Sequence, residues 1–448
     1  MARLILQCRS RYDACKFYHR KNQPIKMHKM LQWAKDLYPI CRSIMGQGTR
    51  DTLAYLKNIH PDLKTLVFKT GEKVFDWEIP KEWNIKDAYL EHESGRKFAE
   101  FKKHNLHVLN YSVPIDQIMD LSELIPHIST QPDQPDWIPY VTSYYKERWG
   151  FCMSEHEKNQ MPPGKYKAYI DSSLTPGELH IGEIYLPGKT QQEIFFSTYI
   201  CHPSMANNEL SGPVLTAALV NYIKQNHPSP YYSYRAVFLP ETIGSIAYLS
   251  RNIKTLKENM TAGFVLSCVG DNRAYSHVES RLGNTLADQA LSAALIGKDN
   301  THVYDFLTRG SDERQYCSPG VDLPVCGFCR SKYAEYPEYH TSADNFDVVT
   351  EEGLAGAFTV MKDIIDAFEL GCLYPQNQIL CEPQLGKRNL YPTLSQKGNS
   401  NKTLQIRMDV LAYADGEHSL FDIARRIKSP LTDITREIKI LREHGLLI

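Results

Sequence analysis

The sequence predicts an α/β protein: a doubly wound mixed sheet that carries an inserted small β-rich domain and a C-terminal winged-helix-like domain. Three observations lead to this prediction. Residues 190–370 repeat a pattern of apolar strand, polar loop and helix. Residues 61–185 contain short alternating runs broken by Gly, Pro and Asp, which favours β-strands. Residues 404–448 contain three short helical patterns.

The α/β core is expected to combine residues 27–60 with residues 186–372. The first stretch has apolar residues at helical spacing and is interrupted by Gly46-Gln47-Gly48, so it predicts one or two helices. The second stretch alternates apolar runs with amphipathic segments, as a doubly wound sheet requires. The predicted strands are 193–200, 234–240, 263–269 and 323–328, and the predicted helices are 210–225, 243–256, 285–296 and 351–369.

The remaining segments are assigned from their composition. Residues 61–185, the inserted domain, are rich in aromatic side chains and contain alternating runs at 65–69 and 106–111. Residues 1–26 are basic and lack the apolar region of a signal peptide, so we expect an extension that need not be ordered. Residues 373–403 are rich in Pro and polar residues and predict a linker that few contacts cross, which leaves the tail separable from the core.

Bulk composition excludes several classes of protein. The chain has 448 residues, of which 42% are hydrophobic and 23% charged, and its net charge is −1. This balance gives no reason to expect nucleic acid as a partner, and no apolar stretch approaches the ~20 residues of a membrane span. The 11 cysteines form no framework, which favours reduced thiols in a cytoplasmic protein. A homo-oligomer is left open.

Three segments place chemically active side chains at the ends of apolar runs. His202 follows the run 194–200, Glu241 follows the run that ends at Leu239, and His340 lies in a third segment of this kind. Open α/β sheets bind ligands at the carboxyl ends of their strands. Imidazole and carboxylate groups gathered there predict a hydrolytic metal site.

The chain resembles a bacterial family of aminopeptidase-like proteins with a C-terminal winged helix, whose core is similar to the co-catalytic zinc aminopeptidases. The resemblance spans about 30–448. Besides the three segments above, it rests on five others in order along the chain: Leu37–Ile44, Thr142–Tyr145, Trp149–Cys152, Ile170–Leu174 and Gly310–Tyr316. It implies the zinc-aminopeptidase-like sheet and a jelly-roll-like form for the insert.

The resemblance also implies a set of site residues. His202, Asn208 and Asp271 would hold a first zinc ion, and Asn208 and His340 would contribute to a second. Glu241 would be the general base. The family pattern has Asp at the position of Asn208 and Glu at the position of Thr242. An amide is a poor bridge between two dications, so we expect one zinc ion, with two left open.

Each residue also has a structural interpretation. Glu241 could cap the following helix, and Asp271 could form a turn. His202 could be a satisfied loop histidine, and His340 could pair with Asp344. Substrate contact is predicted for the run that ends the Gly310–Tyr316 segment, with a guanidinium–carboxylate pair at its centre. Its members are Asp312, Glu313, Arg314 and Tyr316.

The leading hypothesis is a metal-dependent aminopeptidase-like hydrolase that cleaves an amide next to a free amine, in a peptide or an aminoacyl or amino-sugar substrate. The alternative is a degenerate peptidase fold that binds a ligand or regulates without hydrolysis, which Asn208 and Thr242 favour. A third hypothesis is DNA binding by the tail. The basic residues Arg436, Lys439 and Arg442 are offset by neighbouring glutamates, so no basic face is expected and nucleic acid is disfavoured.

Overall fold

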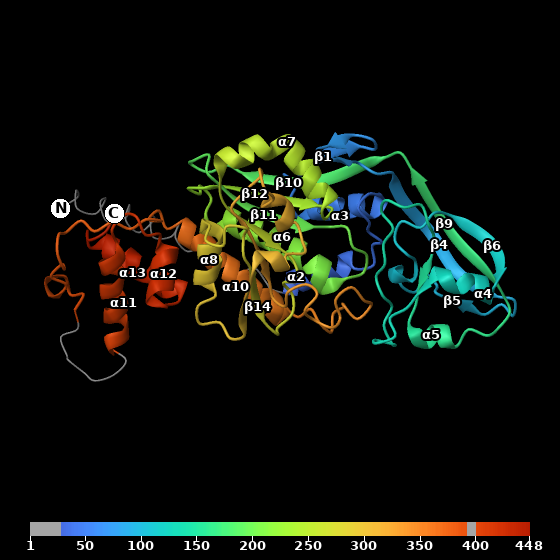
Figure 1. The fold of residues 1–448 in the computed structure, drawn as a ribbon. Coiled ribbons are helices and arrows are strands. Elements are labelled where there is room, and N and C mark those ends of the chain that lie inside the picture. The colour runs from blue at the N-terminus through green and yellow to red at the C-terminus, as the bar shows by residue number, and fades with distance from the viewer. Residues whose placement is uncertain (1–27, 392–399) are drawn as a thin grey trace, which may run out of the picture.

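The computed structural model describes residues 28–391 and 400–448. The predicted extension at 1–26 and part of the predicted linker lie outside the described residues. The chain forms three parts in a row, with the helical tail, the α/β core and the β-rich insert side by side (Figure 1). Among the described helices, none combines the length and apolar character needed to cross a membrane.

The core is built on one mixed sheet of eight strands in the order β1-β10-β12-β11-β13-β16-β14-β15. The four central strands β12, β11, β13 and β16 run parallel, and β10 and β14 join them antiparallel. The strands are β1 (Lys64–Lys69), β10 (Glu178–Leu186), β11 (Glu193–Tyr199), β12 (Ser233–Leu239), β13 (Met260–Leu266), β14 (Tyr275–Val278), β15 (Thr301–Tyr304) and β16 (Val325–Cys329).

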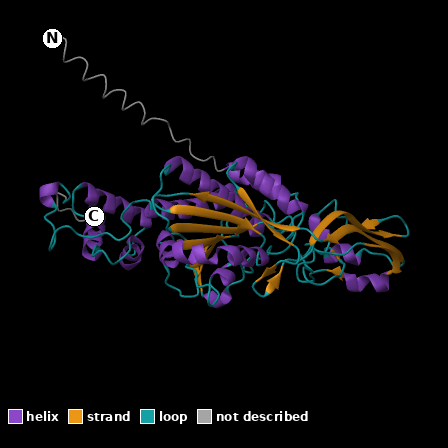
Figure 2. Cartoon of the chain, turned by 90° about the horizontal axis from the view of Figure 1, so that it is seen from above, coloured by secondary structure: helices purple, strands orange, loops and turns teal. Residues whose placement is uncertain are grey.

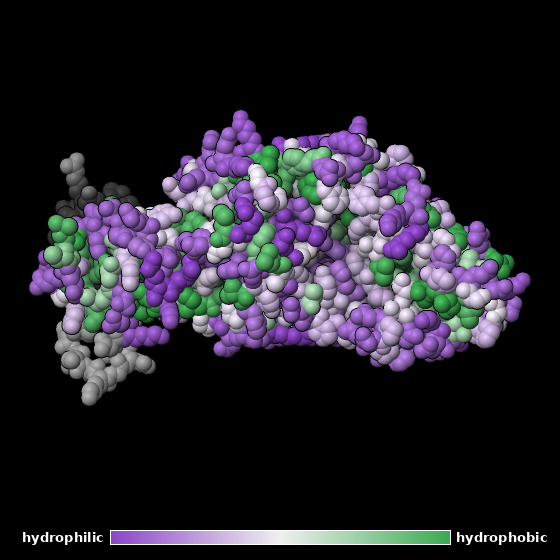
Figure 3. Space-filling view, in the orientation of Figure 1, coloured by the Kyte–Doolittle hydropathy of each residue, from purple (hydrophilic) through white to green (hydrophobic). Residues whose placement is uncertain are grey.

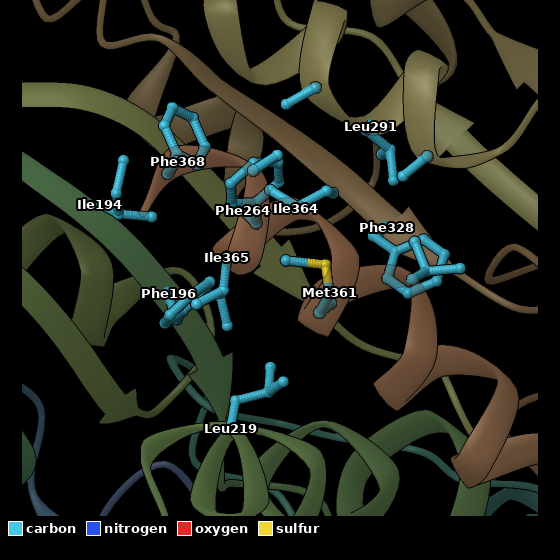
Figure 4. Close-up of a cluster of buried hydrophobic side chains, with 14 of the residues drawn as sticks. Ile194, Phe196, Leu219, Phe264, Leu291, Phe328, Met361, Ile364, Ile365 and Phe368 are labelled. Carbon is cyan, nitrogen blue, oxygen red and sulfur yellow. The ribbon is translucent and has the colours of Figure 1, made fainter. Parts of the chain in front are cut away.

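Helices cover both faces of this sheet, which confirms the doubly wound α/β core (Figure 2). Because neighbouring strand residues point to opposite faces, Phe196 joins one apolar cluster and Phe195 joins the other. Phe196 packs with Phe264 and with Ile365 of the long helix α10 (Figure 4). The core helices are α2 (His28–Leu37), α3 (Gln47–Ile59), α6 (Ser211–Asn226), α7 (Ile243–Asn259), α8 (Leu286–Ala294), α9 (Glu313–Tyr316) and α10 (Glu351–Phe368).

The predicted core strands and helices are all present, with shifts of a few residues at their ends. The short strands β14 and β15 at the sheet edge were not predicted, because four residues with mixed burial show no clear alternation. The predicted strand at 106–111 is wrong. A 3₁₀ turn at Asn105–His107 occupies its start, and only isolated bridges follow, at Val108 and Asn110.

The insert contains an antiparallel four-stranded sheet in the order β5-β4-β9-β6. A β-rich insert was expected, but this single sheet with two short strand pairs is not the pair of packed sheets that defines a jelly roll. The expected segment 61–185 also supplies β1 and most of β10 to the core sheet. The insert elements are β2 (Lys73–Val74), β3 (Trp77–Glu78), β4 (Glu82–His92), β5 (Lys97–Phe98), β6 (Ile115–Asp120), α4 (Leu121–Leu124), β7 (Ile128–Ser129), β8 (Phe151–Cys152), α5 (Glu155–Asn159) and β9 (Lys165–Thr175).

The tail has the three helices that the sequence predicts: α11 (Ser400–Tyr413), α12 (Leu420–Ile427) and α13 (Leu431–Glu443). The Ser419 side chain caps α12 by accepting a hydrogen bond from the backbone N–H of Asp422. Backbone bridges join Gln376 to Asp415 and Asn377 to Leu447, so the start of the predicted linker pairs with the tail.

The expectation that few contacts cross between tail and core is wrong. One continuous buried cluster runs from the sheet through α10 into the tail helices. Phe421 of α12 packs edge to face on Phe368 of α10, with ring centroids 5.0 Å apart. The Ser419 hydroxyl donates to Gln289 of α8, and Arg442 donates to the backbone oxygen of Leu370. The tail is therefore an integral packing element. On the face of the molecule that Figure 3 shows, most of the surface of the described residues is hydrophilic.

Truncating the Phe421 side chain should destabilise the whole chain and not the tail alone. Phe421→Ala is expected to cost ~3–5 kcal/mol in the free energy of unfolding, because Phe421 is fully buried between tail and core. Tyr413→Ala, a matched change on a partly exposed tail residue, should cost under ~1 kcal/mol. Chemical denaturation followed by fluorescence measures both. An unchanged main transition in Phe421→Ala, with a separate early one, would mean that the tail unfolds independently.

Candidate active site

The parallel strands end at one edge of the sheet, where their following loops meet. Cys201 and His202 follow β11, and Glu241 follows β12. Two later loops reach the same place and bring Arg314 and His340. The structure therefore gathers side chains that are far apart in the sequence, as the carboxyl edge of an α/β sheet does.

His202 is held from behind by a buried carboxylate. Its Nδ1 lies 2.8 Å from Oε2 of Glu209, and both side chains are nearly inaccessible. Burial lowers the pKa of His202 to about 3, so the imidazole is neutral at neutral pH. A hydrogen bond from Nδ1–H to the carboxylate leaves the lone pair on Nε2, which faces Glu241 at 3.8 Å.

The charge of Glu209 is balanced by Arg42, which is itself fully buried. Arg42 Nε lies 3.7 Å from Glu209 Oε1 and donates to the backbone oxygen of His202. Its Nη1 donates to the backbone oxygen of Leu37 at the end of α2. Burial raises the pKa of Glu209 to about 8, although the Arg42 guanidinium acts in the opposite direction.

Glu241 stands at the entrance to α7, beside other acidic groups. Burial raises the pKa of Glu241 to about 8; the carboxylate of Asp312 adds to the rise, and Arg314 opposes it. The next residue, Thr242, has a φ of 65°, a backbone conformation that is uncommon for a β-branched residue. The Thr242 backbone N–H donates to Asp312, and its hydroxyl accepts from Arg314 Nη2 at 2.6 Å.

His340 faces His202 across the site. The two ring centroids lie 5.5 Å apart, and the Tyr140 ring contacts both at 5.2 Å. Tyr339 stacks on His340 at 3.9 Å. His340 Nε2 is buried and has no hydrogen-bond partner among the described residues. Such an unpaired imidazole nitrogen is open to a partner, and histidine is the commonest metal ligand.

Asn208 lies in a single π-helical turn, Ala206–Leu210, at the start of α6. Its Nδ2 donates to Tyr199 Oη at 2.7 Å, and its buried Oδ1 has no partner among the described residues. Asp344 accepts the backbone N–H groups of both Asn207 and Asn208 and so fixes the turn. Asp344 thus supports the turn. The structural interpretation of His340 expects it to pair with Asp344, but the two side chains, both within the described residues, form no hydrogen bond or ion pair.

Asp271 is placed differently from the other predicted ligands. Its two oxygens accept hydrogen bonds from Asn207 Nδ2, from the backbone and hydroxyl of Ser331, and from the backbone of Arg273. In the described ranges, the acidic, His and Cys groups that cluster closely around His202 are Cys201 and Glu209, without Asp271. The structure gives Asp271 a supporting role under the site and leaves its metal-ligand role without geometric support.

The predicted substrate residues divide into one that lines the site and three that lie beneath it. Arg314 lines a cavity of about 240 Å³ next to His202 and Glu241. Asp312 is fully buried and supports the start of α7, through Thr242 and Ser245. Glu313 accepts from the backbone of Gly310 and Ser311 and from Tyr333, and Tyr316 bonds to Ser197. The cavity is lined by Ile44, Trp77, Tyr144, Tyr145, Cys201, His202, Glu241, Thr242, Ile243 and Arg314.

Sequence reasoning missed two features of this site. Glu209 receives no supporting role and Arg42 no role from the sequence, although the structure pairs the two behind His202. The signal that could have found the pair is an arginine within a mostly apolar stretch of sequence. Such an arginine is expected to be buried, and a buried guanidinium requires a carboxylate. The cavity lining by Trp77 was also missed, because it depends on how the insert folds over the core.

A second cluster of potential ligands, His277, Asp288 and Cys326, lies buried elsewhere in the core. Asp288 is already saturated there, because it accepts hydrogen bonds from His277, Ser280 and Thr285 while capping α8. This arrangement fits a structural cap and leaves no free oxygen for an ion.

Comparison with known proteins places the chain in a family. A family model described as a domain of unknown function (DUF4910) matches residues 31–371, and a winged helix-turn-helix model matches residues 373–448. A protein of Clostridium acetobutylicum, named provisionally as a polysaccharide biosynthesis protein with an aminopeptidase-like domain, is 42% identical over 402 residues, 88% of this chain and 92% of its own.

Solved structures show the same relationship. A crystal structure from Clostridium acetobutylicum, titled provisionally as a peptidase, superposes with a TM-score of 0.86 and 39% identity, over 94% of this chain and 96% of its own. A zinc aminopeptidase from Bacillus subtilis superposes with a TM-score of 0.54 and 12% identity, over 76% of this chain and 93% of its own, which shows a shared core fold. The chain belongs to the DUF4910 family, with an aminopeptidase-like α/β core and a C-terminal winged helix.

Proposed function

We propose that the protein is a metal-dependent aminopeptidase-like hydrolase that cleaves an amide next to a free amine. The observation that carries this proposal is the arrangement of His202, with Nδ1 on Glu209 and Nε2 directed towards Glu241. A carboxylate on the second ring nitrogen of a histidine is the usual support of a metal-ligating imidazole.

The nine cysteines among the described residues are all free. This agrees with the reducing compartment that we expect from the sequence.

The residues present fit one zinc ion. Two buried atoms, His340 Nε2 and Asn208 Oδ1, have no hydrogen-bond partners among the described residues; the His340 ring faces His202, and the Asn208 amide bonds to Tyr199, whose ring also lies beside His202. His202, His340 and Asn208 would hold the ion, with one or more positions left for water and substrate. A bound zinc ion would supply a Lewis acid. Glu209 is committed to His202 and Arg42, and Thr242 offers no carboxylate, so we propose a single ion.

Glu241 is the candidate general base. Its carboxylate borders the cavity beside His202, with part of its side chain accessible, and lies where a substrate amide would bind. In its ionised form, which a pKa raised to about 8 makes predominant only above that pH, it can accept a proton from an attacking water and deliver it to the leaving amine. The neighbouring support from Asp312 and Ser245 fixes the start of α7 and so the position of Glu241.

We propose a small substrate, either a peptide or an aminoacyl or amino-sugar compound. The cavity of about 240 Å³ suits a small molecule. The polysaccharide biosynthesis role named for the Clostridium acetobutylicum relative supports the amino-sugar form. The alternative proposal is a ligand-binding protein without hydrolysis. It is supported by Asn208, whose neutral amide is a weaker metal ligand than a carboxylate.

We further propose that the winged helix serves packing and not DNA recognition. In the third helix, Arg436 pairs with Asp433, and the buried Glu437 pairs with Arg407 of α11. These pairs neutralise Arg436 and Arg407, and Arg442 is held to the core by its hydrogen bond to the Leu370 backbone oxygen, which reduces the positive charge offered to phosphates. Strong retention on DNA that falls steeply with added salt would overturn this proposal.

The first prediction concerns Glu241. Glu241→Gln keeps the shape of the side chain and removes its ability to accept a proton, so hydrolysis should fall ~10²–10⁴-fold. Zinc content and melting temperature should hardly change, since Glu241 is not a proposed ligand. Initial rates on aminoacyl amides and N-aminoacyl amino sugars measure the effect. If only stability falls and activity remains, Glu241 is a helix cap; if zinc is lost, it is a ligand.

The second prediction concerns metal number. Full-length protein should bind at most one divalent ion tightly, because Asn208 lacks a bridging charge and Thr242 lacks a carboxylate. Asn208→Asp should raise zinc affinity, since a carboxylate is the stronger hard ligand. Elemental analysis after mild chelation measures this. Two retained ions per native chain would contradict it.

The third prediction concerns Glu209. Glu209→Gln leaves the buried Arg42 guanidinium without its counter-charge and should destabilise the fold by ~3–5 kcal/mol. It should also weaken zinc binding ~10–100-fold, because His202 loses its charged support. Glu72→Gln is the control: it removes a carboxylate from an exposed Arg251 pair and should cost under ~1 kcal/mol. Equal effects of the two changes would show that the buried pair has no special role.

A further inference from the structure

Arg314 is a cation in the wall of the cavity that forms no ion pair among the described residues, although its charge acts on Glu241 in the same cavity. It makes no ion pair within 4.0 Å in the described part of the chain, and its one side-chain hydrogen bond goes to the neutral hydroxyl of Thr242. Its Nε is buried and has no partner there. An arginine held in this way has unused donors in a fixed planar fork.

The acidic residues nearest to Arg314 in the sequence each use one oxygen elsewhere, and their second oxygens, Asp312 Oδ2 and Glu313 Oε2, are buried without a hydrogen-bond partner among the described residues. Asp312 accepts from the Thr242 backbone and the Ser245 hydroxyl, and Glu313 accepts from Gly310, Ser311 and Tyr333. Neither carboxylate forms an ion pair with the guanidinium. The free donors of Arg314 are therefore available to a group that enters the cavity from outside.

The insert supplies an aromatic wall to the same cavity. Trp77 of β3 and Tyr145 of a later loop contact each other edge to face, with ring centroids 5.6 Å apart. Both line the cavity, yet 38% of Trp77 and 54% of Tyr145 remain exposed. Exposed aromatic rings next to a cavity offer a flat apolar face, and rings of this kind are enriched where ligands bind.

We infer that the cavity binds a small carboxylate-bearing ligand, with the carboxylate on Arg314 and a ring or apolar face of the ligand against Trp77 and Tyr145. Arginine forms bidentate pairs with carboxylates, and the pairing is strengthened in a partly buried cavity. The inference refines the proposed function, because Arg314 and Glu241 line the same cavity and the carboxylate would lie close to the scissile amide. The substrate class is then acidic: a dipeptide with a free carboxylate, or an aminoacylated uronic sugar.

Two ligand pairs that differ only in the carboxylate test this inference. The first pair is glucuronic acid and glucose, and the second is N-acetylphenylalanine and its amide; none has the free amine next to an amide that the proposed reaction needs. Calorimetric titration into full-length protein should show at least one acid binding ~10-fold or more tightly than its neutral partner. The preference should weaken as salt is raised.

Variants then assign the preference to named residues. Arg314→Met should abolish the preference for the acid. It should weaken binding of the acid ~10–100-fold and change the affinity for the neutral partner by no more than about twofold. Arg314→Lys should keep part of it. Trp77→Ala should weaken both members of a pair alike, since the ring makes no charge-dependent contact. The melting temperature of each variant separates these effects from loss of the fold.

Equal binding of acid and neutral partner, no binding of any of the four probes, or a preference that survives in Arg314→Met would each overturn the inference. Because no probe is a substrate for the proposed cleavage, these outcomes are independent of whether the protein hydrolyses anything. Conversely, a preference lost in Arg314→Met would stand even if Glu241→Gln showed no catalytic role. Zinc affinity should be the same in Arg314→Met and the native chain.

Discussion

The buried pair of Arg42 and Glu209 is the interaction on which the site depends. The two side chains have no solvent access and lie 3.7 Å apart, while Arg42 Nη2 and Glu209 Oε1 have no hydrogen-bond partner among the described residues, so each is the main electrostatic partner of the other. Arg42 bonds to the backbone at Leu37 and His202, and Glu209 bonds to the His202 ring. The pair thus ties the N-terminal helices, the end of β11 and the π-helical turn to one histidine.

This arrangement explains why the rest of the site can be sparse. With Nδ1 of His202 bonded to Glu209, the site we propose needs few further side chains: His340, the amide of Asn208 and the carboxylate of Glu241. Asp344 fixes the turn that carries Asn208 by accepting two backbone N–H groups. Preorganised groups of this kind lower the cost of orienting a substrate. The core fold supplies the positions, and the insert supplies one wall of the cavity.

Much of the fold follows from periodicity, because each buried central strand is a continuous apolar run followed by a helix. The positions of His202 and Glu241 follow as well, since parallel strands end at one edge. Other assignments depend on contacts between distant segments. The family resemblance implies that Asp271 is a metal ligand, yet Ser331 and Asn207 occupy its oxygens.

The same limit explains the other differences. The apolar tail helices read as a separate module, but Phe421 packs on Phe368 across a boundary that composition alone marks as a linker. The jelly-roll form of the insert was expected from the family resemblance, but its strands pair into one four-stranded sheet and two short pairs. The local sequence pattern therefore predicts which helices and strands form. The roles of buried polar and aromatic side chains depend on partners from distant segments, which the pattern does not show.

The most direct test of the central claim is anomalous diffraction at the zinc edge from crystals of the full-length protein equilibrated with zinc. The account predicts one strong peak per chain, within bonding distance of Nε2 of both His202 and His340 and beside Oδ1 of Asn208. No peak at these residues, two peaks there, or a peak only at the second cluster of His277, Asp288 and Cys326 would contradict it.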